Sequence, residues 1–118
     1  MPYITTLKNL VDALPDAIGA ILVDWEGEAV QEYCHCDPYD IRFIAAHKGI
    51  ILTRLKELHT SGRVGAVEEV AITSTDGHLI IGCIDDDYSL VLNVGRACPQ
   101  GQALHHFRDA VAELKREI

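Results

Sequence analysis

The stretch Ala17-Ile18-Gly19-Ala20-Ile21-Leu22-Val23 decides the fold class, because it contains no polar side chain. A strand with one face in water alternates apolar and polar residues, whereas a continuously apolar strand is covered on both faces. The segment 88–94 has the same character through Leu90, Val91 and Leu92. Two such strands predict a sheet with helices packed against both of its sides.

The segments around these strands predict hairpins, and hence an antiparallel sheet. Residues 24–28 predict a turn, in which Gly27 is free to adopt a positive φ, and residues 28–34 a second strand at a sheet edge. A third strand at 64–75 and a fourth at 78–84 flank Asp76-Gly77, a strong hairpin signal. With 88–94 as the fifth strand, the sheet has five antiparallel strands.

Apolar residues at three- and four-residue spacing predict three helices. The first covers residues 3–14 and ends before Pro15. The second covers residues 40–60, with Asp40 as its cap after a loop at 35–39. The last has Pro99 in its first turn. The fold class is therefore α+β, in the order α-β-β-α-β-β-β-α, with three α/β/α layers: the central helix covers one face and the terminal helices the other. The whole chain, 1–118, is one domain.

The central helix has a second apolar stripe. Its main stripe, which must cover the sheet, consists of Ile41, Ile44, Ala45, Ile51, Leu52, Leu55 and Leu58. Phe43, Ala46 and Ile50 lie roughly opposite that stripe. A helix on the surface of a monomer needs only one apolar face, so the second stripe predicts a homodimer interface.

Charge and composition exclude several kinds of partner. The net charge of −8 disfavours nucleic acid and anionic membranes. Eight acids and no Lys or Arg lie between Asn9 and Ile41, which indicates either a solvated acidic surface or a patch that steers a basic partner. Neither a transmembrane helix nor a secretory signal is expected, and a cytoplasmic location is favoured.

Candidate metal sites and catalytic motifs are weak. The four cysteines are Cys34, Cys36, Cys83 and Cys98. Cys34-His35-Cys36 is interpreted as ordinary thiols in preference to half of a zinc site, because no second half-site follows. The acidic run 85–87 is interpreted as a solvated turn in preference to a cation site. The chain contains no phosphate-binding glycine loop and no nucleophile elbow, so we expect no enzyme activity, cofactor or metal.

Several segments together resemble the roadblock/dynein light chain family. They are 18–24 followed by Glu26-Gly27, then 70–72 with 76–81, then 86–92, and finally Gly101 before the last helix. The resemblance implies a homodimer joined through the central helices and the third strands. It therefore places Phe43, Ala46, Ile50, Val67, Glu68 and Val70 at a dimer or partner interface. Alternatively, Glu68-Glu69 guards the edge of the sheet with charge.

The resemblance also implies a function. Members of this family are not enzymes themselves; they scaffold or regulate small GTPases, or link cargo to a motor. A non-enzymatic dimeric regulator or scaffold of a small Ras-like GTPase is therefore expected, acting by surface contact without inserting an arginine. The alternatives are a structural adaptor in a larger complex and, less favoured, a small-molecule sensor or an enzyme of unrecognised type.

Overall fold

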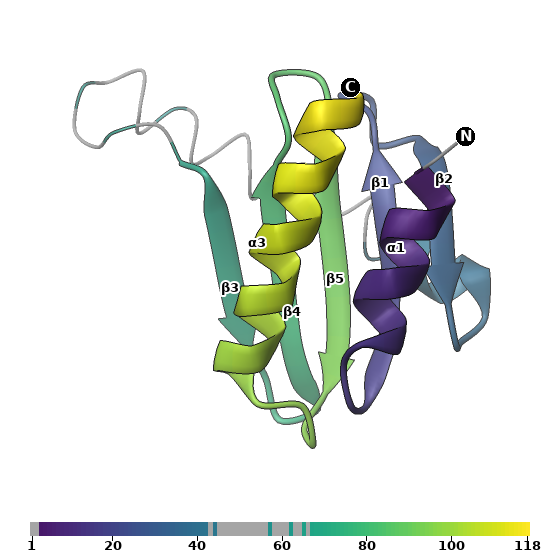
Figure 1. Ribbon diagram of the computed structural model, residues 1–118. Coiled ribbons are helices and arrows are strands. Elements are labelled where there is room, and N and C mark those ends of the chain that lie inside the picture. Colours follow the sequence, from purple (N-terminus) through teal and green to yellow (C-terminus); the bar gives the residue numbers. More distant parts are fainter. Residues whose placement is uncertain (1–2, 43, 45–56, 58–61, 63–64, 66) are drawn as a thin grey trace.

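The computed structural model describes residues 3–42, 44, 57, 62, 65 and 67–118, and contains one antiparallel sheet of five strands (Figure 1). The strands are β1 Ala17–Val23, β2 Ala29–Cys34, β3 Glu69–Thr73, β4 Gly77–Cys83 and β5 Ser89–Gly95. They lie side by side in the order β2-β1-β5-β4-β3. The helices α1, Tyr3–Asp12, and α3, Gln100–Glu117, flank this sheet, which confirms the predicted α+β class.

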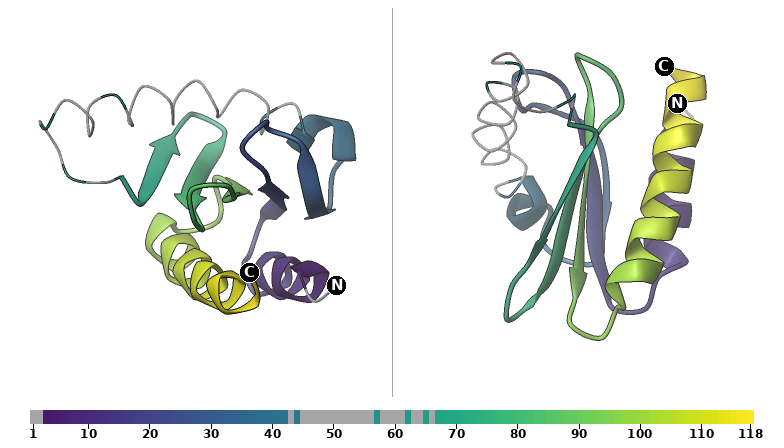
Figure 2. Two further views of the ribbon diagram at one scale, coloured as in Figure 1. Left: turned by 90° about the horizontal axis from the view of Figure 1, so that it is seen from above. Right: turned by 90° about the vertical axis from the view of Figure 1, so that its left-hand side faces the viewer.

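Both faces of the sheet are covered, as the two apolar strands predict. Helices α1 and α3 lie side by side on one face (Figure 2), where they pack on Ala20 and Leu22 of β1 and on Leu90 and Leu92 of β5. The residues between these, Ile21 and Val23 in β1 and Val91 in β5, point to the other face and form a second core with Ile41 and Ile81. Alternation along each strand thus supplies two cores from one apolar run.

The central helix begins at Pro38, so the predicted loop at 35–39 is right for residues 35–37 but ends two residues too late, and the predicted cap Asp40 is wrong. Residues 38–42 and 44 are helical and lie on the face opposite α1 and α3 (Figure 2). Asp37 caps this helix: its Oδ1 accepts a hydrogen bond from the Tyr39 N–H at 3.0 Å, and its carbonyl accepts one from the Asp40 N–H at 2.9 Å. Proline suits the first helical position because its missing N–H would have no partner there.

Other boundaries also differ from the sequence-based expectations. Strand β3 begins at Glu69, so Val67 and Glu68 precede the strand. Helix α1 ends at Asp12, and a tighter i→i−3 bond from the Leu14 N–H to the Val11 carbonyl follows. Pro99 is the N-cap of α3, with extended backbone angles, and is not part of its first turn. No described helix is long and apolar enough to cross a membrane.

The hairpin between β3 and β4 requires glycine at position 77. A Cβ there would lie 2.9 Å from the Gly95 Cα and closer still to the Val94 carbonyl oxygen. Both atoms are backbone, so neither can move without disturbing β5. We expect Gly77→Ala to lower the free energy of unfolding by about 1–3 kcal/mol, as overpacking does. Urea unfolding followed by circular dichroism measures this loss.

A matched substitution in α3 is the control. A Cβ on Gly101 would meet nothing within 4 Å, and the residue is helical. Gly101→Ala should raise the free energy of unfolding by about 0.4–1 kcal/mol, because alanine restricts the unfolded chain. Equal unfolding midpoints for the two variants would contradict the role assigned to Gly77.

Candidate protein–protein interface

Strand β3 is an edge strand, as the sequence predicts. It pairs with β4 on one side and has no partner on its other side among the described residues. The pairing is antiparallel and in continuous register from Glu69 opposite Gly82 to Thr73 opposite His78. An edge of this kind carries a row of unused backbone donors and acceptors, to which another strand can bind.

The hydrogen-bond pattern identifies which backbone groups point outward. The Cys83 N–H donates to the Glu68 carbonyl at 3.0 Å, and the Ser74 N–H donates to the Gly77 carbonyl at 2.8 Å. In an antiparallel ladder the hydrogen-bonded pairs alternate, so the backbone groups of Val70 and Ile72 also point to β4. The N–H and C=O groups of the three residues between, Glu69, Ala71 and Thr73, therefore face outward.

The side chains of β3 divide between the two faces of the sheet. Val70 lies opposite Ile81 and Ile72 opposite Leu79, so these side chains are on the face of the second core. Val70 is half-buried, whereas Ile72 is exposed. Ala71 and Thr73 are exposed on the other face, beyond the cover of α3. The edge thus combines outward backbone groups with exposed apolar area.

Glu69 is held by α3. Arg108 donates from Nε to Glu69 Oε1 at 2.8 Å and from Nη2 to Oε2 at 3.1 Å. This two-pronged contact raises the pKa of Arg108 above its ordinary value. Because Glu69 is turned to the helix, Glu68 is the acid of this pair that stays exposed beside the start of the edge. The structure therefore separates two neighbouring acids for which the sequence predicts the same guarding role.

The predicted interface residues divide into two groups. Val70 lies in β3, and Val67 and Glu68 are the two residues directly before that strand. Phe43, Ala46 and Ile50 lie outside the described residues. Their neighbour Ile44 packs against the second core, as the main stripe predicts.

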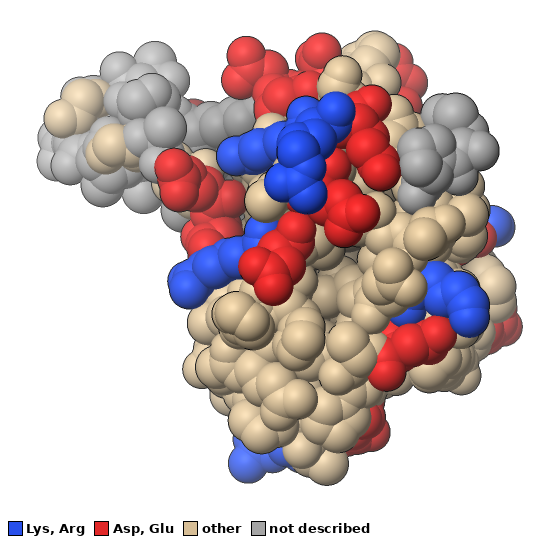
Figure 3. All heavy atoms as spheres, viewed as in Figure 1, with Lys and Arg blue, Asp and Glu red and all other residues tan. Residues whose placement is uncertain are grey.

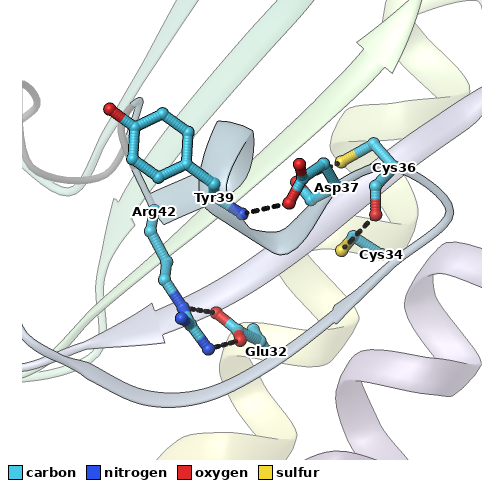
Figure 4. A network of polar contacts seen from close by, with 6 residues as sticks. All are labelled: Glu32, Cys34, Cys36, Asp37, Tyr39 and Arg42. Carbon is cyan, nitrogen blue, oxygen red and sulfur yellow. Dashed lines mark hydrogen bonds and ion pairs between the residues drawn. The ribbon is translucent and has the colours of Figure 1, made fainter.

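The junction between β2 and the central helix is held by polar contacts (Figure 4). Arg42 forms an ion pair with Glu32 of β2, donating from Nε to Glu32 Oε2 at 2.7 Å. The Glu32 carboxylate raises the pKa of Arg42 above its ordinary value. This contact fixes the first turn of the helix relative to the other edge of the sheet.

The free cysteines Cys34 and Cys36 belong to the same junction. Cys34 Sγ donates to the Cys36 carbonyl at 3.3 Å, and Cys36 Sγ donates to the Asp37 carbonyl at 3.4 Å. Partial burial and the hydrogen bond with Cys34 raise the pKa of Cys36 to about 11, so its thiol is protonated at neutral pH. Within the described ranges, no three His, Cys, Asp or Glu side chains converge as metal ligands do. These contacts are typical of packed thiols.

Acidic turns gather at one end of the sheet. The end of β1 and the end of β4 both lie beside Ser89, the first residue of β5, so the turns 24–28 and 85–87 are neighbours. Figure 3 shows acidic side chains at this end, together with basic ones where α3 ends. Asp85 is used within its turn, because its Oδ1 accepts from the N–H groups of Asp87 and Tyr88, each at 2.8 Å.

Comparison with solved structures assigns this arrangement to a known fold. A Roadblock/LC7 domain from Streptomyces avermitilis superposes with a TM-score of 0.85 at 16% identity, covering 97% of this chain and 95% of that one. The chain has the roadblock fold. No protein-family model matches the sequence, and no curated protein matches it.

Two further structures with the roadblock fold carry the name MglB. The gliding protein MglB from Thermus thermophilus has a TM-score of 0.85 at 17% identity, covering 97% of this chain and 86% of that one. An MglB structure described as having a tetrameric arrangement gives the same TM-score and identity, and covers 97% of this chain and 85% of that one. The expected roadblock architecture is therefore confirmed at the level of fold.

The sequence-based predictions did not identify which residues of β3 turn their backbone N–H and C=O groups outward. The signal was present in the Ser74–Gly77 turn, because the pair that closes a hairpin determines which residues of each strand point inward. The contact between Glu69 and Arg108 had no sequence signal, since 39 positions separate the two residues.

Proposed function

We propose that this chain is a non-enzymatic, dimeric regulator or scaffold of a small Ras-like GTPase. The observation that carries the proposal is the roadblock fold, shared over 97% of the chain with proteins named MglB. The family that the sequence resembles regulates or scaffolds small GTPases. A cytoplasmic location suits such a partner.

The proposed dimer joins two copies through the central helices and the β3 edges. Glu69, Ala71 and Thr73 would exchange backbone hydrogen bonds with the same strand of the second copy, which extends the sheet across the two-fold axis. Val67, Glu68 and Val70 would lie along this contact. The second stripe of the central helix, Phe43, Ala46 and Ile50, would be covered by its counterpart.

The proposed mode of action is a shift in the conformation of the GTPase. Of the arginines that could reach into a nucleotide site, Arg42 is in an ion pair with Glu32 and Arg96 donates to the Ser74 carbonyl at 3.0 Å, whereas Arg54 and Arg63 lie outside the described residues. Surface contact can still change the rate by stabilising one conformation of the partner over another. Coupling of this kind changes equilibria by about 5- to 150-fold, less than an arginine supplied in trans.

Single-turnover GTP hydrolysis tests this function. A Ras-like GTPase from the same organism is loaded with GTP, and its hydrolysis is followed with and without this protein. We expect acceleration on the order of 5- to 150-fold at saturation, with no turnover by this protein alone. A tight complex with unchanged hydrolysis would instead support the structural adaptor. Absence of binding to every Ras-like GTPase of that organism would overturn the proposal.

A further inference from the structure

The turn between β1 and β2 presents a tryptophan to solvent. Trp25 is the single tryptophan of the chain, and 67% of its surface is exposed. Tryptophan offers a large apolar area with few rotatable bonds, and for that reason it is prominent among the residues that dominate protein–protein binding energies. An exposed tryptophan in a well-ordered turn is therefore a candidate anchor for a partner.

Hydrogen bonds hold this turn in one conformation. Asp24 Oδ1 accepts from the N–H groups of Glu26 and Glu28, at 2.9 and 3.0 Å. The Asp24 N–H donates to the Glu28 carbonyl at 3.0 Å, and Gly27 has a φ of 85°, which glycine adopts without strain. A turn ordered in advance loses little further entropy when a partner binds.

A cavity lies against the same turn. Its volume is about 440 Å³, and its lining includes Ile21, Gly27, Glu28, Ala29 and Arg42. Ala29 is exposed and contributes apolar surface, whereas Ile21 behind it is buried. Arg42 is neutralised by Glu32, whereas the Glu28 carboxylate has no ion pair with a described residue. Among the described residues of its lining, the cavity thus combines the apolar side chain of Ala29 with the Glu28 carboxylate, which no ion pair neutralises.

The surroundings add negative charge. Glu26 is exposed in the turn itself, and the neighbouring turn at the end of β4 carries Asp86 and Asp87, both exposed. Such a surface repels nucleic acid and anionic lipid at long range and attracts cationic segments.

We propose that the Trp25 turn and the adjoining cavity form a docking surface for an arginine-bearing segment of a partner protein. The methylene stem of one arginine lies against Ala29, and its guanidinium donates to Glu28. A second arginine of the segment stacks on the Trp25 ring, because guanidinium groups bind indole faces through charge and planar contact. This inference concerns a surface remote from the β3 edge and does not depend on the GTPase function.

Trp25 fluorescence tests the surface directly, with a hexa-arginine peptide as the probe and a hexa-glutamate peptide as its control. We expect hexa-arginine to change the emission of Trp25 saturably at 150 mM salt, and hexa-glutamate to leave the emission unchanged. Calorimetry then compares variants, since Trp25→Leu removes the fluorophore. We expect Trp25→Leu to weaken hexa-arginine binding about tenfold and Glu28→Gln about fivefold.

Glu113→Gln is the matched control, because it removes the same charge from α3 in the other helical layer. It should change the dissociation constant less than about twofold at this salt concentration. Equal weakening by Glu28→Gln and Glu113→Gln would show attraction by net charge alone and overturn the site. So would an unchanged affinity in the Trp25→Leu protein, whose fold is verified by circular dichroism.

Discussion

Replacing Ala71 with proline is expected to separate the proposed dimer into folded monomers. The Ala71 N–H points away from β4, so proline removes no bond of the β3–β4 ladder. Proline is tolerated in edge strands when the lost N–H faces outward. The same substitution removes the middle outward donor of the edge and places a ring where a second strand would approach.

Sedimentation equilibrium measures this effect. We expect the dimer dissociation constant of Ala71→Pro to rise about a hundredfold or more, because backbone pairing along the whole edge is disturbed. Ala71→Val retains the N–H and should still dimerise. Ile72→Pro is the opposite control: its N–H points to β4, so the monomer itself should lose stability.

Two results would count against the edge contact. One is an Ala71→Pro protein that dimerises as tightly as the unmodified chain. The other is an unmodified chain that is monomeric at the highest accessible concentration. Hydrogen exchange adds a residue-level check, since the amides of Glu69, Ala71 and Thr73 should be protected only in the dimer.

Truncating Phe107 to alanine should be the most destabilising single change among those considered. Only 1% of its surface is exposed, and its ring lies over Gly82 of β4, where a Cβ would come within 2.6 and 2.8 Å of two ring carbons. Glycine offers no side chain to fill the space left by the ring. We therefore expect a loss of about 3–5 kcal/mol, a large part of the stability of a domain of this size.

Chemical denaturation with Val111→Ala as the comparison tests the role of Phe107. Val111 is one turn later on α3 and only half-buried, so its truncation should cost about 1 kcal/mol. Losses of equal size at the two positions would mean that the ring is not the centre of contact between α3 and the sheet.

Several features of this protein follow from the sequence because they depend on local patterns. The absence of polar side chains in 17–23 required cover on both faces, and the structure places a core on each side of β1. The Asp76-Gly77 signal predicted the hairpin that joins β3 to β4, which the structure contains. Helical spacing predicted both ends of α1 and the start of α3 to within two residues.

Other features were decided by tertiary structure, because they depend on groups far apart in the chain. The order β2-β1-β5-β4-β3 places the last strand between the first and the fourth, and only packing of the two cores selects that pairing. Glu69 turns to Arg108 since the fold brings α3 beside the start of β3. Local sequence thus determined the elements and their apolar faces, while long-range packing determined which backbone edge and which carboxylates stay available to a partner.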